Sequence, residues 1–319
     1  MAELTQRRSS LRRRPEVSTP TGSPITHRTL RRLAVASLVA NVAIVVTGGA
    51  VRLTSSGLGC PTWPRCTDES FVVQGELGWH GALEFGNRML TGLLAVVAFA
   101  TWVAAMRYRP RRSSLRWLAT GLAVGVPAQA LIGGVTVLTG LNPWTVSLHL
   151  LLSLAMIGLA VLFIRRVDEA DEPSRPTVPH AVRVLAQLTF GVCWLVLYVG
   201  TVLTGAGPHA GDAEAPRNGL RPALVSQIHA DLVFLLVGLT IATVLSFKAV
   251  GAPQRAQRAA TWLLVLEVAQ GVVGFVQYFT DLPVLLVGAH LLGAALVSAA
   301  VTWMLLGVRD RGSSERVTT

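Results

Sequence analysis

The sequence predicts an all-α integral membrane protein of eight transmembrane helices, built as two pseudo-symmetric four-helix bundles. Of its 319 residues, 51% are hydrophobic and 14% are charged, whereas a soluble chain carries about a quarter charged residues. A helix of about 20 apolar residues crosses roughly 30 Å of hydrocarbon with its backbone polar groups bonded internally. We find eight such stretches, at residues 31–51, 83–106, 115–138, 143–165, 182–204, 223–247, 259–279 and 283–306.

An internal repeat predicts the division into two bundles. Residues 128–152 read AQALIGGVTVLTGLNPWTVSLHLLL, and residues 269–293 read AQGVVGFVQYFTDLPVLLVGAHLLG. Each copy is an apolar run, a short polar break and a second apolar run that carries one histidine. Aligned without a gap, the copies pair Gln129 with Gln270, Gly133 with Gly274, and His149 with His290. Each half holds an even number of spans, so we expect a parallel repeat, related by an axis along the membrane normal.

This reading divides the chain into five segments. We expect a disordered basic tail at 1–29, an N-terminal bundle at 30–166, a linker at 167–181, a C-terminal bundle at 182–306 and a polar tail at 307–319. The first tail mixes arginine with Ser, Thr and Pro, a composition that cannot bury a core. The first apolar run is long for a signal peptide and lacks a cleavage site, so we interpret it as a span.

The distribution of positive charge predicts the orientation. The net charge is +11, and 23 of the 28 Lys and Arg residues fall on one side if the spans alternate. Positive residues concentrate on the cytoplasmic side, so we expect both termini in the cytoplasm and a multi-pass protein of the cell membrane. Topology and lipid headgroups account for the charge, and we expect no nucleic-acid partner. The five cations on the outer side are Arg52, Arg65, Arg88, Arg217 and Arg221.

The first outer loop, Arg52–Trp79, contains Cys60 and Cys66. Thiols on the outer side meet an oxidising environment, which favours a disulfide. Two free thiols or a metal pair are the alternatives, although a metal site needs more ligands than this loop offers. Cys193 lies within an apolar stretch and is expected to pack as a small apolar residue.

Polar side chains inside the spans indicate a functional site. Glu84 and Asn87 are three residues apart and share one helix face, and a carboxylate inside an apolar helix is functional by default. The alternative is that Glu84 stays hydrated near the outer headgroups. Asn87, His149, His229 and His290 each follow the outer end of their span by seven or eight residues. At 1.5 Å per residue they lie roughly 10–12 Å below that boundary, in one plane.

Two histidines that face each other at equal depth suit the axial positions of a haem. Zinc would require three or four ligands. His229 and His290 therefore predict a bis-histidine haem in the C-terminal half. The N-terminal half offers His149, Asn87 and Glu84 instead, an asymmetric set that favours a substrate site.

Haem propionates at this depth would point outward. Arg52, Arg88, Arg217 and Arg221 are the candidates to pair with them, and the alternative is that each is a solvated loop charge.

Three features together make the chain resemble the haem A synthase family, of the COX15/CtaA type and its cysteine-containing bacterial branch. They are VTGGAVRLTSSGLGCPTWPRC at 46–66, LEFGNR at 83–88, and one histidine in each of the fourth, sixth and eighth spans. The resemblance covers residues 30–306. It implies an enzyme, a haem-dependent oxidoreductase that oxidises the C8 methyl group of haem O to a formyl group. The haem A formed would serve cytochrome oxidase, with haem O synthase and oxidase assembly factors as partners.

The resemblance also implies roles for individual residues. His229 and His290 would ligate a prosthetic haem b, His149 would ligate the substrate haem, and Glu84 would be the essential acid. Cys60 and Cys66 would be the outer-loop pair of the cysteine-containing branch. Many relatives have a histidine where this sequence has Asn87, so ligation of the substrate haem by two histidines is not expected here.

Two other functions fit parts of the pattern. A bis-haem electron-transfer protein of the quinone-linked kind needs four ligand histidines, and Asn87 removes one of them. A small-molecule transporter with a midplane site would need broken helices or charges near the membrane centre, and the sequence indicates neither.

Overall fold

The computed structural model describes residues 25–73 and 78–312. Within these ranges it contains eight helices, each long and apolar enough to cross a membrane. They are α1 (His27–Leu53), α2 (Gly78–Arg107), α3 (Ser113–Leu138), α4 (Pro143–Asp168), α5 (His180–Ala206), α6 (Pro222–Ala249), α7 (Gln254–Phe279) and α8 (Val284–Gly307). The protein is therefore an all-α, multi-pass membrane protein, as predicted. Most of the predicted N-terminal tail and the end of the C-terminal tail lie outside the described residues.

Polar and proline residues set the helix starts. Thr26 caps α1 by accepting a hydrogen bond from the Thr29 amide, and Asn142 caps α4 by accepting one from the Trp144 amide. Proline occupies the first helical position of α4 and of α6. A proline there costs no hydrogen bond, because the first amides of a helix have no partner within it.

The two copies of the repeat turn in the same way. Gly140 and Leu141 separate α3 from α4, and Asp281 and Leu282 separate α7 from α8. All four have φ between 57° and 58°, the left-handed region that lets the chain reverse within a few residues. The polar break in each copy is therefore a tight turn between antiparallel helices.

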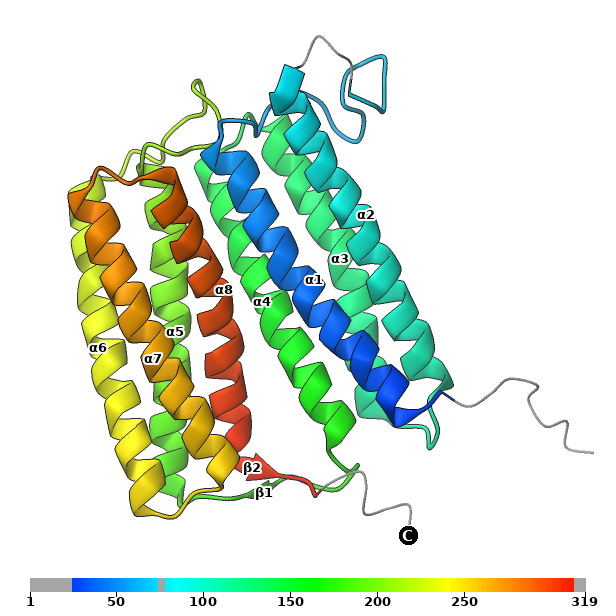
Figure 1. Cartoon of the computed structure of the whole chain (residues 1–319), viewed down its shortest axis with the longest axis vertical. Helices are drawn as coiled ribbons and strands as arrows, with labels where there is room; N and C mark the ends of the chain where they lie inside the picture. The colour runs from blue at the N-terminus through cyan, green and yellow to red at the C-terminus, as the bar shows by residue number, and fades with distance from the viewer. Residues whose placement is uncertain (1–24, 74–77, 313–319) are drawn as a thin grey trace, which may run out of the picture.

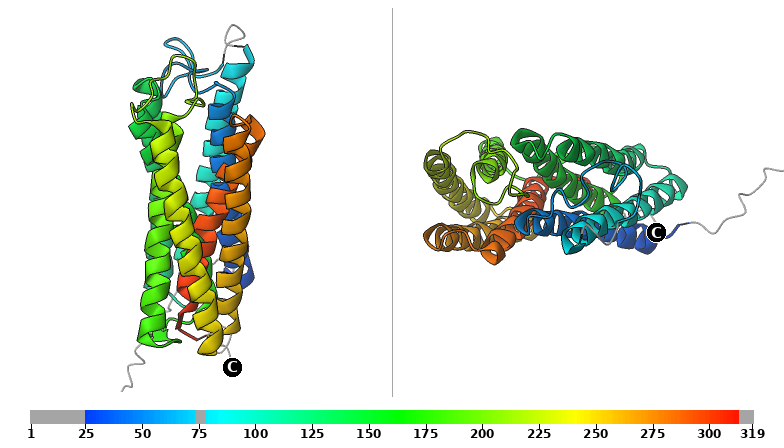
Figure 2. Two further views of the ribbon diagram at one scale, coloured as in Figure 1. Left: turned by 90° about the vertical axis from the view of Figure 1, so that its left-hand side faces the viewer. Right: turned by 90° about the horizontal axis from the view of Figure 1, so that it is seen from above.

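The helices form two adjacent groups of four (Figures 1 and 2). In the first group α1, α2, α3 and α4 contact one another around a closed ring, and in the second α5, α6, α7 and α8 do the same. The groups meet where α8 packs on α1 and α4, and where α4 packs on α5. In each ring the diagonal pairs matter for the site: α2 lies opposite α4, and α6 lies opposite α8 (Figure 2).

We name the two ends of the helical layer by what lies there. The Cys60 end holds the segments 54–73 and 207–221 and the turns after α3 and α7. The linker end holds both described termini and the segment 169–179 between α4 and α5 (Figure 1). There, β1 (Arg175–Pro176) pairs antiparallel with β2 (Arg309–Asp310), so the linker is joined to the residues after α8.

Large apolar side chains cover the outside of the layer. Leu285 is 86% exposed, Trp117 77% and Phe279 76%. Exposed apolar residues this large and this numerous are unusual on a soluble protein, and they are expected where helices face lipid.

Candidate functional site

The two histidines of the second ring meet across its diagonal. His229 lies on α6 and His290 on α8, with ring centroids 6.5 Å apart and ring planes at 69°. Two imidazoles that share one metal ion at about 2.0–2.1 Å per metal–nitrogen bond have centroids roughly 6 Å apart. The centroid distance of the pair is therefore the distance expected for two axial imidazoles of one iron.

Each histidine of the site rests on a glycine of the helix before it. A β-carbon on Gly200 of α5 would lie 3.1 Å from Cε1 of His229. On Gly274 of α7 it would lie 3.4 Å from Cε1 of His290, and on Gly133 of α3 it would lie 3.3 Å from Cε1 of His149. These glycines give the rings room to lie flat against the neighbouring backbone, so they fix where each imidazole can point.

Two of these histidines also accept, at their backbone carbonyl, a hydrogen bond from a glutamine side chain. Gln129 Nε2 donates to the carbonyl of His149 at 3.1 Å, and Gln270 Nε2 donates to the carbonyl of His290 at 2.8 Å. The Nδ1 atoms of both imidazoles are buried and have no hydrogen-bond partner among the described residues. A buried polar atom without a partner costs free energy, so hydrogen bonding within the core does not explain these histidines, whereas a ligand would.

The first ring carries a different set. His149 lies on α4 and Asn87 on the diagonally opposite α2. The Asn87 amide oxygen accepts a hydrogen bond from the hydroxyl of Thr47 on α1 at 2.8 Å. Thr47 therefore holds the Asn87 amide oxygen, a role that sequence reasoning missed because the two residues are 40 positions apart.

Helix geometry places the four polar residues at similar depth. Counted from the first residue of each helix, His149 and His290 are six residues in, His229 seven and Asn87 nine. At 1.5 Å per residue this is roughly 9–14 Å from the Cys60 end, a somewhat wider spread than the sequence predicted.

Glu84 lies one turn nearer the Cys60 end than Asn87 and is 5% exposed. One carboxylate oxygen accepts from the backbone amide of Cys60 at 2.7 Å, and the other accepts from the Arg88 guanidinium at 2.5 Å. Hydration near headgroups, the alternative considered for Glu84, is therefore wrong: the carboxylate is enclosed by protein. Buried charges persist when they are paired and hydrogen-bonded in this way.

Cys60 and Cys66 form a disulfide, as predicted, so neither is a free thiol or a metal ligand. Between them Trp63 packs directly on Gly134 of α3, where a β-carbon would overlap the indole. Gly134 is the neighbour of Gly133, on which His149 rests. The disulfide loop is therefore anchored at two points of the first ring, at Glu84 and beside His149.

Most of the outer arginines donate hydrogen bonds to backbone carbonyls, chiefly those of the loops. Arg52 donates to the carbonyls of His209 and Thr204, each at 2.8 Å. Arg88 donates to the carbonyl of Cys60 at 3.1 Å in addition to pairing with Glu84. Arg217 donates to the carbonyls of Ala215 and Pro208, and Arg221 is exposed at the start of α6. Their pairing with propionates stays a prediction.

Glu267 on α7 is a second buried carboxylate, which the sequence reasoning missed. It is 3% exposed and accepts a hydrogen bond from the hydroxyl of Thr240 on α6 at 2.9 Å. The rule that drew attention to Glu84, a charge inside an apolar span, applies equally to Glu267. It lies one turn from Gln270, which holds the backbone at His290.

Comparisons with known proteins identify a family that this chain matches. The family model described as COX15-CtaA, cytochrome oxidase assembly protein, matches residues 31–82 and 76–217. A protein named "Heme A synthase" from Halalkalibacterium halodurans is 23% identical over 283 residues, covering 86% of this chain and 93% of the relative.

Two further relatives carry the same name. One from Bacillus cereus is 24% identical over 288 residues, covering 84% of this chain and 90% of its own. One from Geobacillus thermodenitrificans is 24% identical over 292 residues, covering 88% and 91%. The family model matches more than half of the chain and includes the disulfide loop, Glu84 and His149. The chain therefore belongs to the COX15-CtaA family of cytochrome oxidase assembly proteins.

Proposed function

We propose that this protein is an oxidoreductase of haem A biosynthesis that converts the C8 methyl group of haem O into a formyl group. Two successive hydroxylations of the methyl group, each a two-electron oxidation by an oxidant supplied from outside the chain, followed by loss of water from the gem-diol, give the aldehyde. The family and the relatives named "Heme A synthase" support haem A biosynthesis. The asymmetry of the polar residues supports the assignment of chemistry to the first ring.

The second ring would hold the prosthetic group, a haem b. The observation that carries this is the pair His229 and His290, with ring centroids 6.5 Å apart. Haem b bound there would supply electron transfer through its iron. The protein's contribution is rigidity: Gly200 and Gly274 seat the two rings, and the Gln270 side chain fixes the backbone at His290.

The first ring would bind haem O as substrate. His149 on α4 lies diagonally opposite Asn87 on α2, and an amide is a weaker iron ligand than imidazole. A substrate haem held by one strong ligand can leave as product, whereas two imidazoles would retain it.

Glu84 would act from its fixed position. Its charge is held in place by the Cys60 amide and Arg88, so it can stabilise positive charge that develops on the substrate or accept a proton. The disulfide loop that Glu84 anchors would exclude water from this end of the ring.

The orientation follows from charge. We place the Cys60 end outside and the linker end in the cytoplasm of a cell membrane, because the positive-inside bias puts 23 of 28 Lys and Arg there. Single cysteines introduced at Glu69 and at Lys248 test this with a membrane-impermeant thiol reagent on intact cells. Only the Glu69 position should be labelled, and labelling at Lys248 would overturn the orientation.

Haem analysis tests the function. The full chain is co-expressed with haem O synthase, and extracted haems are separated. Haem A should accumulate with the wild-type chain and disappear with Glu84→Ala, while the low-spin spectrum of the C-terminal haem stays. Glu69→Ala, an exposed carboxylate of the same loop, is the matched control and should be normal.

The same experiment distinguishes the alternative, a bis-haem electron-transfer protein. That protein would yield two low-spin haems and no haem A, with or without Glu84. Such a result would refute the proposed enzyme.

A further inference from the structure

A cavity lies at the linker end, away from His149, His229 and His290. Its volume is about 560 Å³, and it lies between α4, α5 and α8. The walls are mainly apolar, with Leu159 and Leu162 from α4, Phe190 and Trp194 from α5, and Leu305 from α8. Because α4 belongs to the first ring and α5 and α8 to the second, the cavity lies on the boundary between the two.

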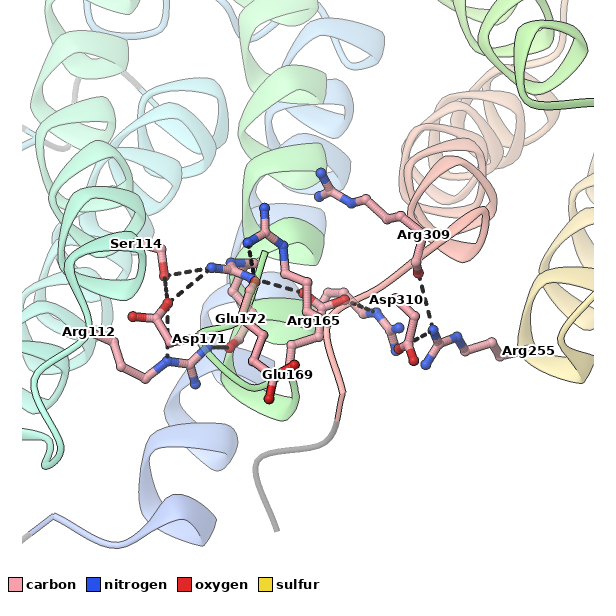
Figure 3. Close-up of polar contacts among 11 residues, drawn as sticks. Arg112, Ser114, Arg165, Glu169, Asp171, Glu172, Arg255, Arg309 and Asp310 are labelled. Carbon is pink, nitrogen blue, oxygen red and sulfur yellow. Dashed lines mark hydrogen bonds and ion pairs between the residues drawn. The ribbon is translucent and has the colours of Figure 1, made fainter. Parts of the chain in front are cut away.

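The polar side of the cavity is basic. Arg183 and Arg309 both line it, together with Gln187 and Ser174, and no carboxylate does so among the described residues. Neither arginine has a side-chain hydrogen bond or an ion pair within 4 Å in the described parts of the chain. Figure 3 shows the Arg309 side chain extending from the start of β2 toward α4, with no dashed line to its guanidinium.

Two carboxylates near the cavity, Glu169 and Asp310, are paired with other arginines. Glu169, 1% exposed, pairs with Arg165 at 2.8 Å and with Arg166 at 3.2 Å. Asp310 pairs with Arg255 at 2.6 Å (Figure 3). In the described parts of the chain, the positive charges of Arg183 and Arg309 beside the cavity therefore have no ion-pair partner.

The surroundings of Arg309 make its unpaired positive charge energetically unfavourable. Burial lowers the pKa of the Arg309 guanidinium; Glu169 opposes that effect, and Arg311 and Arg166 add to it. An anion bound beside Arg309 would relieve this repulsion, and it would accept charge-assisted hydrogen bonds from Arg309 and Arg183, which both line the cavity.

We propose that this cavity binds an anionic phospholipid, with its phosphate between Arg183 and Arg309 and an acyl chain along α4, α5 and α8. Basic pockets between transmembrane helices recognise anionic headgroups, and the apolar walls match a hydrocarbon chain. A neutral amphiphile such as a quinol would not need two cations. Bound across the boundary between the rings, the lipid stabilises their packing, because a ligand of the folded state raises its stability.

Native mass spectrometry of the full-length protein tests the proposal. The protein is reconstituted in phosphatidylcholine discs that contain a small fraction of phosphatidylglycerol. The wild-type chain should retain one phosphatidylglycerol and unfold at a higher temperature than in pure phosphatidylcholine. Free inorganic phosphate, added alone to phosphatidylcholine discs, should give no stabilisation, because it lacks the chain; stabilisation equal to that by the lipid would refute a lipid site.

Two kinds of variant separate a built site from general surface attraction. The double variant R183Q/R309Q should retain phosphatidylglycerol at least tenfold less, whereas R258Q, an exposed arginine of the same end, should behave as wild type. Ala155→Phe fills the cavity and keeps both arginines, and it should also lose the lipid. Equal retention by all variants, or retention that follows only the number of arginines, would overturn the proposal. Co-purification of a quinone in place of the phospholipid would do so too.

Discussion

Removing the Glu84 carboxylate should remove one of the two contacts that anchor the disulfide loop on the first ring, the other being Trp63 on Gly134. In Glu84→Ala the amide of Cys60 loses its acceptor and Arg88 loses its only described ion-pair partner. Breaking a buried ion pair by removing one partner costs about 3–5 kcal/mol. Arg88 still donates to the carbonyls of Cys60 and Arg65, each at 3.1 Å, so we expect the lower end, about 3 kcal/mol. That corresponds to roughly 100-fold more frequent opening of the loop.

Hydrogen exchange followed by mass spectrometry measures this directly. Peptides that contain the Cys60 amide should exchange about 100-fold faster in Glu84→Ala, while peptides from α6 and α8 should not change. Glu69→Ala is the control, because Glu69 is exposed in the same loop. Unchanged protection at Cys60, or equal effects of the two variants, would refute the anchoring role.

Glu84→Gln separates anchoring from chemistry. The Gln side chain can still accept a hydrogen bond from the Cys60 amide but carries no charge. If the loop stays protected and haem A formation is lost, the charge of Glu84 is needed in the reaction. If haem A formation follows loop protection across Glu84→Gln, Glu84→Ala and Arg88→Met, Glu84 is a positioning residue only. Because Glu84 and Arg88 are in contact, their effects should not add.

Three further predictions concern the haem sites and the linker end. His290→Ala should lose the low-spin haem spectrum and His149→Ala should keep it but lose haem A; the opposite pattern would exchange the roles of the two rings. Gly200→Ala would place a β-carbon 3.1 Å from Cε1 of His229 and should push that ring, and overpacking of about 1–3 kcal/mol should lower haem retention roughly 5- to 100-fold. Gly191→Ala on the same helix, with open space at its β-carbon, should not, and equal retention in the two would exclude the close contact. The hydrogen bond from Arg255 lowers the pKa of Asp310 from its ordinary value of 3.8. The ion pair therefore stabilises β2 at pH values above 3.8, and this stabilisation is lost as the pH falls through the lowered pKa of Asp310. Pepsin should consequently cleave near β2 increasingly with acidification. Asp310→Asn should remove that dependence, and an unchanged acid profile would refute it.

The eight spans and the histidine positions were predictable because they depend on local properties of the chain. Apolar run length decides which segments can cross a bilayer, and counting residues along a helix gives depth at 1.5 Å per residue. The internal repeat also predicted that His149 and His290 occupy equivalent positions in the two halves of the chain. The two turns with matching φ values at Gly140–Leu141 and Asp281–Leu282 agree with this locally, while the symmetry of the whole halves stays a prediction.

The partner of each polar side chain was decided only by the tertiary structure. Glu84 accepts from an amide 24 residues away, Arg52 donates to a carbonyl 157 residues away, and Thr47 orients Asn87 from another helix. The glycines beneath the histidines and the basic cavity at the linker end depend in the same way on how helices pack. Composition and periodicity specify which face of a helix is apolar, but the rotation and contact of one helix against another depend on side chains from distant parts of the chain. For this reason the sequence located the candidate site along the chain, and the packing of the helices determined what each of its residues touches.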